Sequence, residues 1–150
     1  MDQSEKSPEQ EWEEHFDELV DKLKSLLNSV EMLSTEGLNF NSGDVCSKKE
    51  ERQKFIELIE KNNPRDVTLF YANKRYVYIR DLENQYSKTP FFLFVSMDLD
   101  DIGIKRGMIV TEYCGFILVG TFNNTNSANA VRYFCNCVCE NLSQYEMIEE

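Results

Sequence analysis

The sequence predicts an α+β fold built on an antiparallel meander of about five strands. Three observations predict it: an amphipathic helical pattern in the first 33 residues, five short runs of β-branched and aromatic residues between positions 67 and 122, and a second helical pattern after position 128. The predicted order is therefore a helical arm, a short helix, the sheet and a C-terminal amphipathic helix.

The first element is predicted as one helix from Ser7 to Leu33. Ser7 and Gln10 have the spacing of a capping box, and Pro8 falls at the first helical position, where its missing N–H costs nothing. Apolar residues then recur at alternating spacings of four and three, as in the seam of a heptad repeat. Six of these apolar residues are predicted to bind a protein partner or a second copy: Trp12, Phe16, Leu19, Leu23, Leu26 and Val30. The same stripe can instead pack on the chain's own sheet, and the pattern leaves both alternatives open.

The chain divides into four predicted segments. Residues 1–36 form the acidic helical arm, with eight acids against one Lys between positions 2 and 18. Residues 37–46 are a linker, because this stretch is rich in Gly, Asn and Ser, which favour turns. Residues 47–145 form the α+β domain, and residues 146–150 are an acidic tail.

The domain is predicted to open with a short helix. Ser47 and Glu50 make a second capping-box pattern. The helix must end by Asn63, because Pro64 disfavours helical geometry at the residue before it. Its inward face is expected to carry Phe55, Ile56 and Ile59.

Five strands follow, because each run is apolar, rich in β-branched or aromatic residues and bounded by turn residues. Asn73 and Gly115 are placed at the turns of two hairpins. The predicted strands are Val67–Tyr71, Tyr76–Arg80, Phe91–Met97, Met108–Tyr113 and Phe116–Phe122.

Residues 128–145 fit two periodicities. As a helix, they place one apolar face along the sheet; as a strand, they alternate Cys135, Cys137 and Cys139 to one side. The length and the Asn/Ser-rich start favour the helix. Its apolar face would carry Val131, Phe134, Cys135, Val138, Leu142 and Tyr145.

Composition limits the function. The 150 residues carry 16 Lys and Arg against 27 Asp and Glu, a net charge of -11, which opposes general binding to nucleic acid or anionic membranes. No apolar run is long enough for a membrane span, and the first residues do not resemble a signal peptide. An odd number of Cys, five, then favours reduced thiols in the cytoplasm or nucleus.

No catalytic, cofactor-binding or metal-binding residue is predicted. His15 is the single histidine and lies on the charged helix, which disfavours histidine-based metal sites and triads. The closely spaced cysteines after position 134 do not have the spacing of zinc ligand pairs. A cysteine-dependent enzyme that uses Cys46 or Cys114 as its nucleophile remains an alternative.

Two basic pairs adjoin predicted strands. If their loops meet, the four side chains can contact a phosphate or an acidic peptide. They are Lys74, Arg75, Lys105 and Arg106.

Two resemblances to known families add expectations. The segment Arg106–Phe122, with Asn126 and Asn129 after it, resembles the first motif of Sm-like proteins: two apolar strands around a Gly, a second Gly five residues later and a polar turn. This resemblance implies a subunit in ribonucleoprotein assembly. A strand meander closed by a C-terminal helix is also similar to the pleckstrin-homology and phosphotyrosine-binding superfold, whose members mostly bind peptides or phosphoinositides.

The function that these observations favour is non-enzymatic. We expect a protein–protein interaction module that acts as an adaptor, assembly factor or regulatory subunit of an intracellular complex, binding its partner or itself through the N-terminal helix. The Sm-like subunit and the cysteine-dependent enzyme are the alternatives.

Overall fold

The computed structural model of the chain describes residues 7–24, 27–35, 37–43, 47–61, 64–66, 69–71, 74–83, 89–99, 103, 105–113, 115–123 and 130–140. Its centre is one seven-stranded antiparallel sheet in the order β2-β1-β7-β6-β5-β4-β3. The strands are β1 (Ser29–Leu33), β2 (Asn39–Gly43), β3 (Leu69–Tyr71), β4 (Lys74–Leu82), β5 (Phe91–Leu99), β6 (Lys105–Tyr113) and β7 (Phe116–Asn123).

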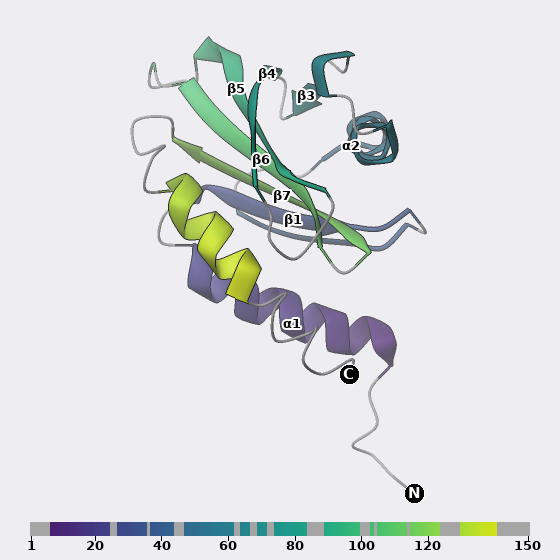
Figure 1. Cartoon of the computed structure of the whole chain (residues 1–150). Helices are drawn as coiled ribbons and strands as arrows, with labels where there is room; N and C mark the ends of the chain where they lie inside the picture. The colour runs from purple at the N-terminus through teal and green to yellow at the C-terminus, as the bar shows by residue number, and fades with distance from the viewer. Residues whose placement is uncertain are drawn as a thin grey trace, which may run out of the picture.

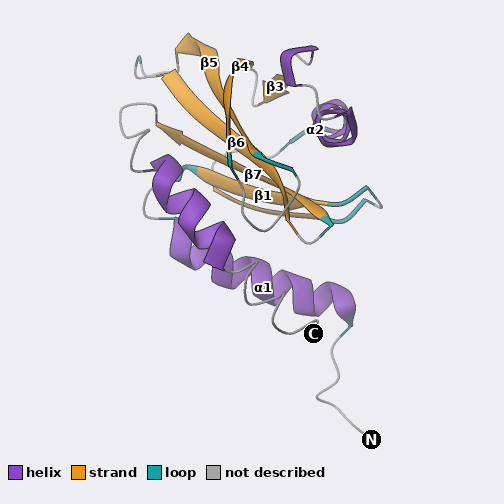
Figure 2. Ribbon diagram, in the orientation of Figure 1, coloured by secondary structure: helices purple, strands orange, loops and turns teal. Residues whose placement is uncertain are grey.

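Helices cover both sides of the sheet (Figures 1 and 2). The helix α1 (Pro8–Leu23) and a helix of residues 130–140 pack on one side, which we call the α1 face. The helix α2 (Lys49–Lys61) packs on the other side, the α2 face, and is followed by a short 3-10 turn, Pro64–Asp66. The predicted α+β class is confirmed, but the sheet has seven strands and the prediction had about five.

The predicted helix from Ser7 to Leu33 is wrong beyond Leu23. The predicted capping box at Ser7 is present, with Gln10 N–H donating to Ser7 Oγ and Ser7 N–H donating to Gln10 Oε1. The helix nevertheless ends at Leu23, and Ser29–Leu33 forms β1. All five residues of β1 are buried, because both faces of the sheet are covered there. Along β1 the polar Ser29 and Glu31 alternate with Val30 and Met32, but Val30 and Leu33 also continue the spacing of four and three from the helix, so the heptad pattern extends into the strand by coincidence.

The predicted linker also contains a strand. Residues 39–43 form β2, which pairs with β1 in register from Leu33↔Asn39 to Ser29↔Gly43. The predicted division into a helical arm and a separate domain is therefore wrong: β1 also pairs with β7, so the N-terminal segment is part of the same sheet. The sequence pattern does not indicate β2, because this edge strand consists mostly of polar residues and an edge strand needs few apolar side chains.

Most residues of the predicted N-terminal stripe are buried in the α1-face core. Phe16, Leu19, Leu23 and Val30 are each 2% exposed or less and pack with residues of β2, β5, β6, β7 and the helix 130–140. Packing on the chain's own sheet is therefore the alternative that the structure shows for these four residues. Trp12 is partly buried beside the same core, and Leu26 lies outside the described residues.

Residues 130–140 are helical, as the favoured alternative predicted. Phe134 and Val138 are buried, and Val131 and Cys135 are half-buried; Leu142 and Tyr145 lie outside the described residues. The helix lies close to β7 because Gly120 has no side chain. A Cβ added at this glycine would lie 2.9 Å from Cε2 of Phe134.

The start of α2 differs from its predicted capping box. Phe55 is buried on the α2 face, with Ile56 and Ile59 partly buried, as expected. However, it is Glu51 that accepts from the Lys48 N–H, at 2.7 Å, in the place predicted for Glu50. The hydroxyl of Ser47 donates to the buried carboxylate of Glu31.

Neither resemblance describes this fold. The segment that resembles the Sm-like motif does form the hairpin β6–β7, but β1 pairs with the far edge of β7 and continues the sheet. The pleckstrin-homology-like topology required a meander closed by one C-terminal helix. Here the β1–β2 hairpin precedes the meander in sequence and helices cover both faces.

Candidate functional site

Part of the α1 face is left uncovered by the helices. Val77 and Val95 lie opposite each other on β4 and β5, and Val95 lies opposite Gly107 and then Phe122 on β6 and β7. Directly paired residues point to the same side of a sheet, and Phe122 belongs to the α1-face core. The two valines therefore point to the α1 face, yet they are only half-buried. Figure 1 shows why: α1 and the helix 130–140 lie over the β1 and β7 side of the sheet, away from β3.

Larger apolar side chains are exposed beside these valines. Phe70 on β3 lies opposite Arg75, which is two residues from Val77 and so points to the same side. Phe70 is 55% exposed, and Met97, two residues beyond Val95, is 47% exposed. We call this surface the open face; it consists of Phe70, Arg75, Val77, Val95 and Met97.

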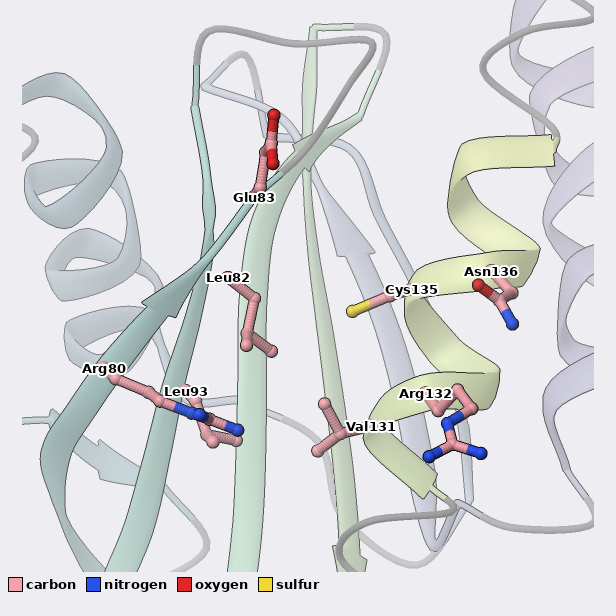
Figure 3. A pocket seen from close by; sticks show the side chains of 8 residues that line it. All are labelled: Arg80, Leu82, Glu83, Leu93, Val131, Arg132, Cys135 and Asn136. Atoms are coloured by element: carbon pink, nitrogen blue, oxygen red, sulfur yellow. The ribbon is translucent and has the colours of Figure 1, made fainter.

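A pocket of about 520 Å³ lies where the open face meets the helix 130–140. Figure 3 shows it between this helix and strands β4 and β5. Its apolar side chains are half-buried and pack against the edge of the α1-face core. They are Leu82, Leu93, Val131 and Cys135.

Charged side chains form the rim of the pocket. Arg80 reaches across Leu93 from β4, Arg132 extends from the helix, and Glu83 lies at the far end beyond Leu82 (Figure 3). All three charged residues are exposed. An apolar floor with a few polar groups at its edge is the usual form of a binding pocket in proteins.

The thiol in this pocket is an apolar lining group. Burial, and then the nearby Cys139, raise the pKa of Cys135 to about 12. Burial also raises the pKa of Cys137. A thiol with a raised pKa is a poor nucleophile, because the thiolate is the reactive form. Cys46 and Cys114, the two predicted nucleophiles, lie outside the described residues.

The structure brings the two predicted basic pairs to the same end of the sheet. Lys74 and Arg75 begin β4, and Lys105 and Arg106 begin β6, with β5 between them. Successive side chains of a strand point to opposite faces of the sheet, so the two residues of each basic pair lie on different faces. Arg75 and Lys105 point to the α1 face with the open-face residues, whereas the other two residues point to the α2 face.

Sequence reasoning missed the arginines of the pocket. Arg80 falls in a predicted strand and Arg132 in the predicted C-terminal helix, and 52 positions separate them in sequence. Only the packing of that helix on the sheet brings them to one pocket. No local pattern signals such a pair.

The predicted partner-binding stripe is placed differently. Phe16, Leu19, Leu23 and Val30 are within the core. The ring of Trp12 packs against Phe116, with centroids 4.7 Å apart. Binding a partner through this stripe would therefore require opening the core.

Among the residues that the structure describes, no group of three His, Cys, Asp or Glu side chains is arranged to hold a metal ion. None of the described helices is both long and apolar enough to cross a membrane.

Comparisons with known proteins show the fold alone. The sequence matches no protein-family model and no curated protein. The structure is similar to that of profilin IA from Acanthamoeba castellanii, with a TM-score of 0.55 and 16% sequence identity over 87% of this chain and 98% of that chain. The chain therefore has a profilin-like α+β fold.

Proposed function

We propose that the protein is a non-enzymatic protein–protein interaction module that docks a partner on the open face and its pocket. The observation that carries this proposal is the exposed apolar side chains of the open face, on the same side of the sheet as a pocket beside the helix 130–140. Exposed apolar patches on soluble proteins mark interaction sites. The protein would act as an adaptor, assembly factor or regulatory subunit, as expected from the sequence. Its contact surface would be the sheet and not the N-terminal stripe.

The charges around the open face favour an acidic partner. Arg75, Lys105, Arg80 and Arg132 are all on this side, in a chain whose net charge is -11. Arginine is enriched in protein interfaces because its planar group binds carboxylates and also packs on apolar surface. We therefore expect the partner to present apolar side chains flanked by carboxylates, and the association rate to fall as salt rises.

The test is a quantitative capture of partners with matched variants of the full chain. Met97→Asp and the double variant Arg80→Glu/Arg132→Glu change the open face and the pocket rim at exposed positions. Lys61→Glu at the exposed end of α2 is the control. Proteins lost by both open-face variants and retained by the control support the proposal, provided that all variants unfold at the wild-type temperature. Partners retained equally by every variant would contradict it.

The alternatives remain predictions. The Sm-like role would use β6 and β7, which lie in the middle of the sheet and are mostly buried. A cysteine-dependent activity would need a reactive thiol, and stoichiometric labelling of one Cys at neutral pH would indicate it. Cytoplasmic or nuclear location also stays a prediction from the sequence.

A further inference from the structure

Strand β2 is an edge strand: among the described residues its sole neighbour is β1. The Ser34 N–H donates to the Leu38 carbonyl, at 2.9 Å. Because hydrogen-bonded and non-hydrogen-bonded pairs alternate in an antiparallel hairpin, this bond determines which pairs of β1 and β2 are hydrogen-bonded. In the observed register, Met32↔Phe40 and Val30↔Ser42 are then the hydrogen-bonded pairs. The backbone N–H and C=O groups of Asn39 and Asn41 therefore point away from β1, toward the open edge.

This edge has no charged residue, proline or bulge of its own. Natural proteins block such edges with charged side chains, prolines or bulges. β2 has the sequence Asn-Phe-Asn-Ser-Gly, without a charge or a proline, and its register with β1 is uninterrupted. The edge is short, but it is open to an added strand.

A pocket of about 290 Å³ lies beside this edge, between β2 and α1. Glu13, Phe16 and Asp17 line it from α1, and Asn39, Phe40 and Asn41 line it from β2. The Phe40 ring points to α1, with its centroid 5.9 Å from that of Phe16.

The two asparagine side chains of β2 point the other way. That of Asn39 donates to Glu31, which also binds Ser47 and Tyr71 on the α2 face. The side chain of Asn41 donates to Asn39 Oδ1. The backbone of β2 therefore forms one wall of the pocket.

The opposite wall is acidic. Glu13 and Asp17 are exposed and one helical turn apart, and α1 carries seven acids against Lys22. Residues four apart on a helix are separated by about 6 Å along its axis, and alternate residues of a strand by about 7 Å. Figure 1 shows α1 lying alongside β1 and β2. An added strand can therefore place two alternate basic side chains opposite these two carboxylates.

We propose that the β2 edge and the Glu13–Asp17 pocket form a strand-addition site for an extended basic segment of a partner protein, with Lys or Arg at two alternate positions. Backbone hydrogen bonds to Asn39 and Asn41 give the affinity, and the two carboxylates select the basic side chains. This site is separate from the open face and does not depend on the function proposed for it.

The test uses a synthetic peptide, acetyl-Ser-Thr-Lys-Thr-Lys-Thr-Ser-amide, and NMR-detected amide exchange of the full chain. We expect the peptide to slow exchange of the Asn41 and Asn39 amides, whereas the amides of Phe40 and Ser42 are protected already. The isosteric variant Glu13→Gln/Asp17→Asn should bind about tenfold more weakly, since two partly exposed ion pairs are lost. The control variant Glu11→Gln/Glu18→Gln has the same charge change and should bind within about twofold of the wild type.

Other results would overturn the proposal. One such result is the absence of peptide binding at low salt. Another is equal binding of a peptide with Glu in place of both Lys, or of a peptide N-methylated at the backbone N–H groups that would face β2. A third is slowed amide exchange at residues other than Asn39 and Asn41. Arg80→Glu/Arg132→Glu should bind the peptide like the wild type, so failure here is distinguishable from failure of the open-face proposal.

Discussion

At the scale of single residues, Glu31 is the main polar feature of the interior. Its side chain is 0% exposed and accepts hydrogen bonds from the Ser47 N–H at 3.0 Å, the Tyr71 hydroxyl at 2.8 Å, the Ser47 hydroxyl and the Asn39 amide. A buried carboxylate is tolerated when donors satisfy it. These donors come from β2, β3 and the residues before α2, so the carboxylate ties all three to β1.

Removal of one of these donors should destabilise the fold. Tyr71→Phe keeps the ring but leaves Glu31 with one donor fewer, so we expect a loss of about 1–3 kcal/mol in the free energy of unfolding, measured in urea. Tyr78→Phe is the control, because its hydroxyl donates to the exposed Asp81 at 2.6 Å. A loss under about 0.5 kcal/mol is expected for the control. Equal losses for both variants would contradict the role given to Glu31.

His15 should make stability depend on pH. Burial lowers the pKa of His15 below its ordinary value of 6.5, against the opposing effect of Glu18. Between pH 6.5 and the lower pKa of His15 in the folded chain, the unfolded chain binds more protons than the folded chain, so stability falls as the pH falls through this window. Urea midpoints at about pH 7 and about pH 5 should fall more for the wild type than for His15→Gln. Identical slopes would show that the histidine is not linked to folding.

At the scale of elements, the fit between the helix 130–140 and β7 depends on one glycine. Gly120 leaves the space that the Phe134 ring fills. We expect Gly120→Ala to cost about 1–3 kcal/mol of unfolding free energy, because the new methyl group overlaps the ring. Phe134→Leu should offset part of that cost in the double variant, so the two changes should be non-additive in a double-mutant cycle. Strict additivity would mean that the two residues do not touch.

The elements also show what the sequence can and cannot predict. The strands β3 to β7, α1 up to Leu23, α2 and the C-terminal helix follow from local periodicity and turn residues. β1 could not be separated from the helix before it, because its apolar residues continue the same spacing and neither Gly nor Pro intervenes. β2 reads as a linker because Asn, Ser and Gly dominate it. For the candidate site, Arg75 and Lys105 were predicted, whereas the pocket around Arg80 and Arg132 arises only from tertiary packing.

At the scale of the whole molecule, charge and apolar surface are divided between regions. The outer side of α1 is acidic, whereas the open face is apolar with basic residues around it. The N-terminal stripe packs on part of the α1 face, and we propose the open face beside it as a surface for a partner. This division is the reason that the contact surface is assigned to β3, β4 and β5.

Site-directed photo-crosslinking in cells tests this assignment most directly. The crosslinker p-benzoylphenylalanine would replace exposed Met97 on the open face in one variant and exposed Glu18 on α1 in another. We expect a discrete crosslinked partner from position 97 that is absent from position 18. Crosslinks to the same partner from position 18 alone would show that it docks on the helix, and would contradict the assignment to the open face.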